Sequence, residues 1–208
     1  MNAPSAAQAG SSSSVRSDGV PFITRWTGED DAPSPVVERR DGRGIRYADE
    51  RAYDRVDGIL WARVPSQPGR GKPEFGVVHS LRQRLAMNGL LCQVCGQSAD
   101  RNADGVLWLV DAERDDLRPG DERTSHPPVC LPCARWSVHA CPHLRRAWVA
   151  VRVRSFALCG VNGALYAPGR PAPVVLRAGL LDFGDPFLPW VRASQLIMAL
   201  QDFTVTDL

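Results

Sequence analysis

Two short cysteine pairs constrain this chain more than any other feature of its sequence. Cys92 and Cys95 form one Cys-x-x-Cys pair, and Cys130 and Cys133 form the other. A disulfide across so short a loop is not a typical structural bridge, whereas thiolates at this spacing are typical ligands of tetrahedral zinc. The matched pairs therefore predict a Zn2+ ion held by these cysteines, with a fold built around it.

A reducing compartment would keep these thiols free to bind metal, and the sequence favours one. Residues 1–20 contain no apolar run and no basic segment of the secretory type, so we expect a disordered tail there. No later window holds about 18 consecutive apolar residues, which argues against a membrane-spanning helix. We therefore expect a cytoplasmic protein without a membrane partner, in which paired cysteines bind metal rather than form disulfides.

The rest of the sequence predicts one compact α+β domain over residues 21–208. A chain of 208 residues with 44% hydrophobic content can bury a single good core. Apolar residues at helical spacing predict a helix over residues 77–88, with His79 on its polar face or at its cap. Residues 106–110 predict a strand by their β-branched and aromatic content. Residues 133–141 contain no Gly or Pro and predict a second helix.

The order of these elements resembles the treble-clef zinc finger. A cysteine knuckle comes first, then a strand-rich hairpin, and then a second cysteine pair at the mouth of a helix, here over about residues 81–143. Gly96 suits the tight backbone of the knuckle, and helix dipoles stabilise thiolate charge in the first turn. We expect this module to be embedded in the larger domain.

Among treble clefs, residues 81–141 resemble the zinc-bearing HNH nuclease family. The resemblance rests on LRQRLAMNGLLCQVCG, residues 81–96, and on VCLPC, residues 129–133. In that family the first hairpin strand ends in an Asp-His pair, and the His is the general base that activates water. Here Asp111 is followed by Ala112, which cannot accept a proton. The resemblance therefore implies the zinc fold without the catalytic His, and we predict no catalytic residue.

Arginines are distributed unevenly along the chain. Residues 123–181 hold eight arginines and no acid, whereas residues 100–122 hold eight acids and three arginines. Residues 148–156 alternate with period two, which places arginines and a tryptophan on one face of a strand. Phosphates attract arginine and bases stack on aromatic rings, so this pattern favours binding of DNA or RNA. The candidate contacts are Arg135, Arg145, Arg146, Trp148, Arg152 and Arg154.

Two alternatives to a non-catalytic nucleic-acid-binding protein stay open. The arginines could pair with the acids of residues 111–122 inside the fold, which would favour another protein as the partner. His126 could act as a displaced base in a divergent HNH-like endonuclease. No motif indicates a small-molecule cofactor.

Two further metal hypotheses involve the other cysteines and histidines. His139, Cys141 and His143 could form a second site with His126, although alternate residues of a helix point in different directions. The other hypothesis is an iron–sulfur cluster in a redox sensor resembling WhiB-like regulators, which would leave Cys92 unused. Its ligands would be Cys95, Cys130, Cys133 and Cys141.

Residues 144–208 predict a β-rich extension that ends in a helix. The segment Gly160-Val-Asn-Gly163 predicts a hairpin turn, and residues 174–176 predict a strand. Residues 191–200 predict a C-terminal helix, because Leu196, Ile197 and Leu200 lie at helical spacing. Taken together, the sequence predicts a non-catalytic zinc-binding protein that binds nucleic acid through an Arg-rich face.

Overall fold

The computed structural model confirms the expected fold class. It describes residues 19–30, 34–111, 117, 118, 120 and 122–208. Helices and strands are mixed in one compact α+β domain. The predicted tail lies outside the described residues except for Gly19 and Val20, and Val20 is already buried.

Strands dominate the domain, and two α-helices pack against them. The strands are β1 (Thr24–Trp26), β2 (Val36–Glu38), β3 (Ile45–Tyr47), β4 (Arg55–Val56), β5 (Ile59–Trp61), β6 (Pro73–Val78), β7 (Arg101–Asn102), β8 (Gly105–Val110), β9 (Glu122–Thr124), β10 (Val149–Ala167), β11 (Val174–Asp182) and β12 (Val191–Thr206). The helices are α1 (Ser80–Gly89) and α2 (Leu131–Ala140), with short 3-10 turns η1 (Ala52–Asp54) and η3 (Leu188–Trp190).

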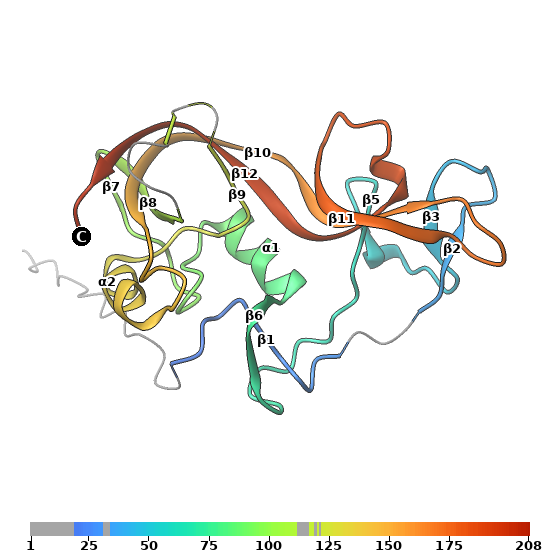
Figure 1. Ribbon diagram of the computed structural model, residues 1–208, viewed down its shortest axis with the longest axis horizontal. Coiled ribbons are helices and arrows are strands. Elements are labelled where there is room, and N and C mark those ends of the chain that lie inside the picture. The colour runs from blue at the N-terminus through green and yellow to red at the C-terminus, as the bar shows by residue number, and fades with distance from the viewer. Residues whose placement is uncertain (1–18, 31–33, 112–116, 119, 121) are drawn as a thin grey trace, which may run out of the picture.

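Two long strands, β10 and β12, run along the length of the molecule (Figure 1). They pair antiparallel, with registers that extend from Ala150 opposite Thr206 to Leu165 opposite Val191. On its other edge, β10 pairs first with β8 and then with β11. The outer edge of β12 carries β5 and β9. The ladder therefore joins the cysteine-bearing end of the molecule to the end that holds β2, β3 and β11.

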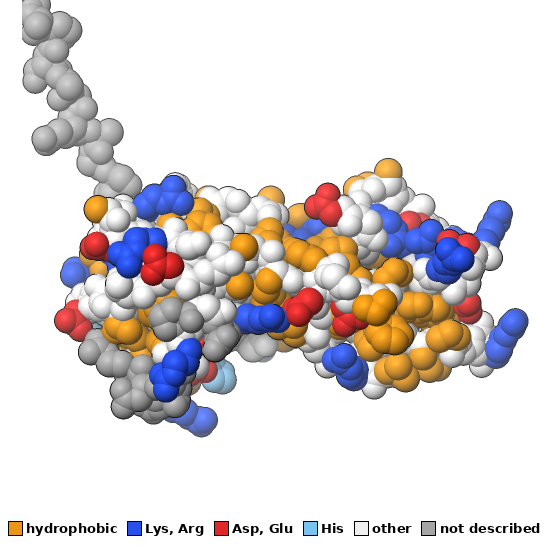
Figure 2. Space-filling view, turned by 90° about the horizontal axis from the view of Figure 1, so that it is seen from above, with side chains coloured by type: hydrophobic (Ala, Val, Ile, Leu, Met, Phe, Trp, Pro, Cys, Tyr) orange, Lys and Arg blue, Asp and Glu red, His pale blue; other side chains and the backbone are white. Residues whose placement is uncertain are grey.

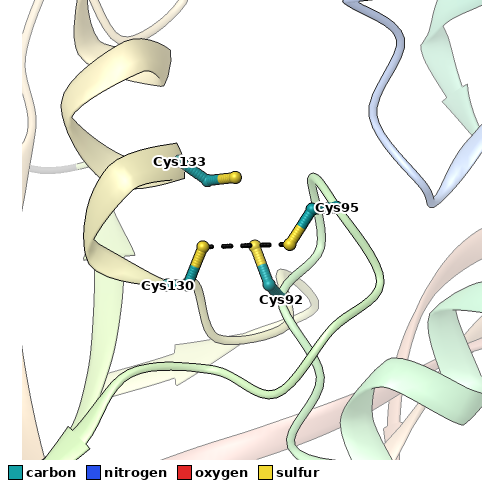
Figure 3. A group of neighbouring side chains, drawn as sticks. All are labelled: Cys92, Cys95, Cys130 and Cys133. Atoms are coloured by element: carbon teal, nitrogen blue, oxygen red, sulfur yellow. Dashed lines mark hydrogen bonds between the residues drawn. The ribbon is translucent and has the colours of Figure 1, made fainter. Parts of the chain in front are cut away.

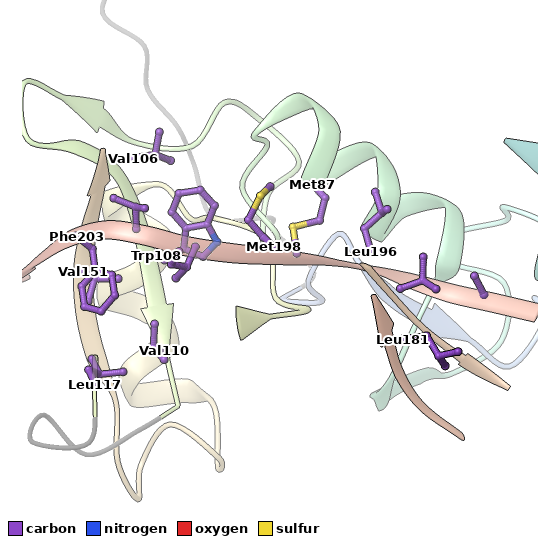
Figure 4. Packing of buried hydrophobic residues seen from close by; sticks show 14 of the residues in the cluster. Met87, Val106, Trp108, Val110, Leu117, Val151, Leu181, Leu196, Met198 and Phe203 are labelled. Carbon is purple, nitrogen blue, oxygen red and sulfur yellow. The ribbon is translucent and has the colours of Figure 1, made fainter. Parts of the chain in front are cut away.

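The main hydrophobic core lies along one face of this sheet (Figure 4). Trp108 of β8 is fully buried and its ring lies 5.4 Å from that of Phe156, centroid to centroid. Met87 extends from α1 into the same cluster and Phe203 closes it near the end of β12. Burying each large apolar side chain contributes about 2 kcal/mol to the free energy of unfolding, and this burial is the main stabilisation of the core.

The C-terminal helix predicted over residues 191–200 is wrong, because these residues form most of β12. The helical spacing of apolar residues misled the prediction. Leu196, Ile197 and Met198 are buried in succession because both faces of the strand are covered at this point. A short apolar run buried on both faces has no clear period, so periodicity alone does not distinguish strand from helix.

The predicted hairpin turn at Gly160-Val-Asn-Gly163 is also wrong, since β10 continues through it. A Cβ atom at Gly160 would clash with the Leu181 carbonyl oxygen, and one at Gly163 would clash with that of Arg192. These glycines therefore allow neighbouring strands to approach closely rather than form a turn. The predicted strand at 174–176 is confirmed as the start of β11.

Helix α1 is confirmed over most of the expected range, but it begins at Ser80 because Val77 and Val78 belong to β6, and it presents the opposite face to the core. Leu81 and Leu85 are 39% and 50% exposed, whereas Arg82 and Gln83 are buried. The Gln83 amide donates to the Leu196 carbonyl oxygen and accepts from the Leu196 N–H, both at 2.9 Å. It thereby occupies the gap on the edge of β12 between the registers of β5 and β9. His79 is confirmed as the N-cap, because its Nδ1 accepts from the Arg82 N–H at 3.3 Å.

A buried ion pair connects α1 to the N-terminal segment. The Arg82 guanidinium donates to both carboxylate oxygens of Glu29, at 2.6 and 2.7 Å. Glu29 also accepts from the backbone N–H groups of Trp26 and Gln67 at 2.9 and 2.7 Å. Burial raises the pKa of the Glu29 carboxyl, but these hydrogen bonds outweigh burial and lower its pKa to about 2. One carboxylate therefore holds three segments of chain together.

Replacing this carboxylate tests its contribution to stability. Glu29→Gln leaves the buried Arg82 guanidinium without its negative partner, although the Thr24 carbonyl and the Ser66 hydroxyl still accept from it. We therefore expect a loss on the order of 3 kcal/mol in the free energy of unfolding near pH 7. Glu74→Gln is the matched control, because Glu74 pairs with Arg25 where both are partly exposed, and it should cost less than about 1 kcal/mol. Urea unfolding measures both values.

The same pair predicts how stability depends on pH. The pKa of Glu29 in the folded protein, about 2, lies below its ordinary value of 4.5. The pair therefore stabilises the fold fully above about pH 4.5 and loses this effect as the pH falls towards 2. The difference in the free energy of unfolding between wild type and Glu29→Gln should therefore become smaller as the pH falls from about 4.5 towards 2. A difference that stays constant from neutral pH to about pH 3 would contradict this account.

Candidate metal centre

The first cysteine pair lies in a tight knuckle closed by backbone hydrogen bonds. A β-bridge joins Leu91 and Ser98, and the Cys92 N–H donates to the Gln97 carbonyl at 2.6 Å. Gly96 has φ of 76°, in the left-handed region that glycine adopts without strain. This conformation turns the chain so that Cys92 and Cys95 face the same point.

The second pair begins helix α2. Cys130 is its N-cap and Cys133 lies in its first turn, where backbone N–H groups have no partner within the helix. Pro132 suits this position because its missing N–H is not needed in the first turn. The partial positive charge at this helix end stabilises negative sulfur atoms. The predicted order of knuckle, hairpin (β7 and β8) and helix is the order found.

The four sulfur atoms converge on one point (Figure 3). All of them lie within 4.8 Å of one another, and the Sγ atoms of Cys95 and Cys130 are 3.8 Å apart. A tetrahedron with metal–sulfur bonds of about 2.3 Å has edges of about 3.8 Å. All four cysteines are buried, at 8% exposure or less. The residues present therefore fit a single metal ion with four thiolate ligands.

Burial and hydrogen bonding shift the pKa values of the clustered thiols in different directions. A hydrogen bond with the Cys92 thiol lowers the pKa of Cys130 to about 5, helped by the Cys133 backbone N–H. The same interaction raises the pKa of Cys92, and burial together with the Cys130 charge raises that of Cys133. Without a cation, the cluster thus favours one thiolate among protonated neighbours. A bound metal ion removes this limit, because it neutralises the remaining thiolates as they form.

Strand β8 explains how the centre is attached to the rest of the fold. Its residues alternate, so that Trp108 faces the main core while Leu107 and Leu109 pack around the cysteines. Ala150 of β10 belongs to the same cysteine-centred cluster. The Phe22 N–H donates to the Val94 carbonyl at 2.8 Å, so the N-terminal segment also braces the knuckle. The centre therefore forms a second small core behind the sheet.

The positions relevant to nuclease chemistry lie at the far end of β8. Asp111 is exposed directly after the strand, and Ala112 lies outside the described residues. The side chain of His126 is exposed, and its backbone carbonyl accepts from the Trp108 indole N–H at 3.2 Å. Endonuclease activity therefore stays an alternative without an assembled site to support it.

The other proposed metal ligands do not come together. Among the described residues, the cysteine cluster is the only group of three or more Cys, His, Asp or Glu side chains placed to share an ion. Cys141 is the C-cap of α2, and eight residues of helix put it about 12 Å along the axis from Cys133. His139 and His143 are exposed near this end. Neither the second metal site nor the iron–sulfur ligand set is assembled.

The predicted nucleic-acid contacts fall into two groups. Arg152 is buried to 8% exposure and pairs with Asp100, and Arg154 pairs with Asp202 at 3.0 Å. These partners replace the acids of residues 111–122 that the sequence suggested. The second group consists of exposed arginines. No carboxylate in the described part of the chain forms a salt bridge with them. They are Arg135, Arg145 and Arg146.

A groove of about 600 Å³ lies between α2, β10 and the end of β12. Trp148, half-buried against the cysteine-centred cluster, contributes to its lining together with Arg135. The groove thus brings two of the predicted contacts, Arg135 and Trp148, next to the end of β12, which lies far from them in the sequence. The alternating pattern of residues 148–156 did not predict this groove, because α2 and the end of β12 contribute to its lining.

Comparison of the chain with protein-family models, with curated proteins and with solved structures found no match. The HNH resemblance therefore stays a prediction based on the residues that suggested it. Neither helix in the described part of the chain is long and apolar enough to cross a membrane.

Metal analysis of the purified protein tests the centre directly. We expect about one metal ion per chain, and we expect Cys92→Ser or Cys133→Ser to abolish binding because each removes one of four ligands. Cys141→Ser and Cys159→Ser are matched controls that remove thiols outside the cluster and should retain the metal. Metal that survives Cys92→Ser but is lost in Cys141→Ser would contradict the assignment.

Proposed function

We propose that this protein uses a structural Zn2+ ion to hold a surface that binds nucleic acid. Zinc is the ion that closed sets of four cysteine thiolates most often hold in structural sites. With four protein ligands, such a site leaves no open position for water or substrate, so its role is to fix the fold. The proposal is therefore a binding protein rather than an enzyme.

The observation that carries the proposal is a set of exposed arginines near the cysteine cluster that form no salt bridge with the described carboxylates. Arg135 follows the ligand Cys133 by half a turn of α2, so the metal would fix where its side chain begins. Arg145 and Arg146 lie in the segment directly after the helix, and the Arg145 Nε donates to the His139 carbonyl at 3.1 Å. This side of the module therefore presents three arginines that form no salt bridge with a carboxylate of the described residues.

Exposed, unpaired arginines are what phosphate recognition requires. A guanidinium already paired with a carboxylate must give up that partner to bind phosphate, which reduces the gain. Arg152 and Arg154 are in that position, because Asp100 and Asp202 balance their charges. The proposed contacts with the phosphate backbone are therefore Arg135, Arg145 and Arg146.

Fluorescence anisotropy with labelled oligonucleotides over a range of salt concentrations tests this function. We expect the triple variant Arg135→Ala, Arg145→Ala, Arg146→Ala to lose at least about tenfold in affinity and to reduce the salt slope by about two to three. Arg154→Ala is the matched control and should change affinity less than about twofold, because Asp202 balances its charge. Equal affinities for the wild type and the triple variant would show that these arginines are not the contacts.

The second candidate function is binding of another protein, and one observation favours it. Among the strands of the described residues, β10 is the one that pairs with β11, and Val174, Val175 and Leu176 on β11 are each more than half exposed. Apolar side chains gather at this end of the molecule (Figure 2). Such an edge fits an extended apolar segment of a partner protein that adds a strand to the sheet.

The two candidates predict different outcomes of the same titration. If the wild type binds no oligonucleotide even at low salt, about 50 mM, the nucleic-acid proposal is wrong and the β11 edge becomes the leading surface. If Val175→Lys leaves oligonucleotide affinity unchanged while the arginine variant loses it, nucleic acid is bound at the metal module.

A further inference from the structure

The groove beside α2 combines an apolar floor with polar walls. Its floor includes Trp148 and Ala150 of the cysteine-centred cluster, and Val138 contributes from α2. Thr206 at the end of β12 and the acidic Asp207 after it also line the groove. Its volume, about 600 Å³, lies in the range of sites that hold small organic groups.

One side of the groove carries the positive charge of Arg135. Arg135 and His139 both line it and are four residues apart on α2, so they lie on the same side of the helix. Both side chains are exposed. Arg145 lies outside the lining of the groove, but its Nε donates to the His139 carbonyl at 3.1 Å, which places a second guanidinium near this end of α2. A phosphate would therefore be attracted to the Arg135 side of the groove rather than to the side that Asp207 lines, and Trp148 offers an aromatic surface in the same groove.

The tryptophan in the groove packs against the metal module. Trp148 is partly buried against the cluster that contains the four cysteines, so its indole orientation depends on the metal module. A fixed aromatic ring beside cationic side chains is how proteins bind single strands, with bases stacked on the ring and phosphates along the charges. Bases within a duplex are stacked on each other and do not reach such a hollow unless they are extruded.

We propose that this groove accepts an unstacked nucleobase on Trp148, so that the ligand is single-stranded nucleic acid. This inference rests on the proposed nucleic-acid function and narrows it to one class of ligand. The base stacks on the indole, and the phosphates on either side of it lie along Arg135, His139 and Arg145. A duplex reaches only the arginines, through its phosphates, and binds more weakly.

Anisotropy titrations with one sequence as a single strand and as a duplex test the inference. We expect the single strand to bind at least about tenfold more tightly, and Trp148→Leu to remove most of that preference by deleting the stacking surface. Trp148→Phe should retain much of it, since phenylalanine still stacks. Trp136→Leu is the matched control, because Trp136 packs on the same cluster but does not line the groove. Metal content shows whether each variant is folded.

A crosslinking experiment on the wild-type protein keeps the test independent of variant folding. A single strand that contains 5-bromouridine, irradiated in complex with the protein, should yield a crosslinked peptide that includes Trp148. Crosslinks confined to other surfaces would overturn the inference. So would equal affinity for duplex and single strand, an outcome that leaves the proposed nucleic-acid function standing. Absence of binding to either form would overturn both.

Discussion

Four sulfur atoms buried within 4.8 Å of one another cannot all carry negative charge unless a cation lies among them. The knuckle and the first turn of α2 bring these atoms together across 35 residues of sequence. The rest of the module depends on this convergence: the position of α2, the packing of Leu107 and Leu109, and the fixed indole of Trp148. Without the ion, protonated thiols would leave the small core behind the sheet weakly held.

The fold connects this module to the remainder of the chain through shared strands rather than through a linker. Strand β8 places alternate residues in the main core and around the cysteines, and β10 continues from the module to the opposite end of the molecule. The buried pair of Glu29 and Arg82 then ties the N-terminal segment to α1. We therefore expect loss of the metal to alter the packing of the sheet as well, because β8 and β10 contribute residues to both cores.

Local patterns in the sequence predicted what depends on local structure. Cysteine spacing identified the cluster, and composition identified α2 and most of β8. The partners of α1 could not be found in this way, because Arg82 and Gln83 are buried by residues 53 and 113 positions away. Leu196, Ile197 and Leu200 fitted a helix as well as a strand, and only burial on both faces decided between them. The balance of Arg152 by Asp100 is likewise a tertiary contact with no local signal.

We propose that one zinc ion with four sulfur ligands organises the surface for which we propose nucleic-acid binding. X-ray absorption at the zinc edge of the purified protein measures the ligand shell directly. The account predicts four sulfur neighbours at about 2.3 Å and no nitrogen or oxygen ligand. A shell that includes nitrogen or oxygen, or a protein that holds iron with inorganic sulfide instead of zinc, would contradict it.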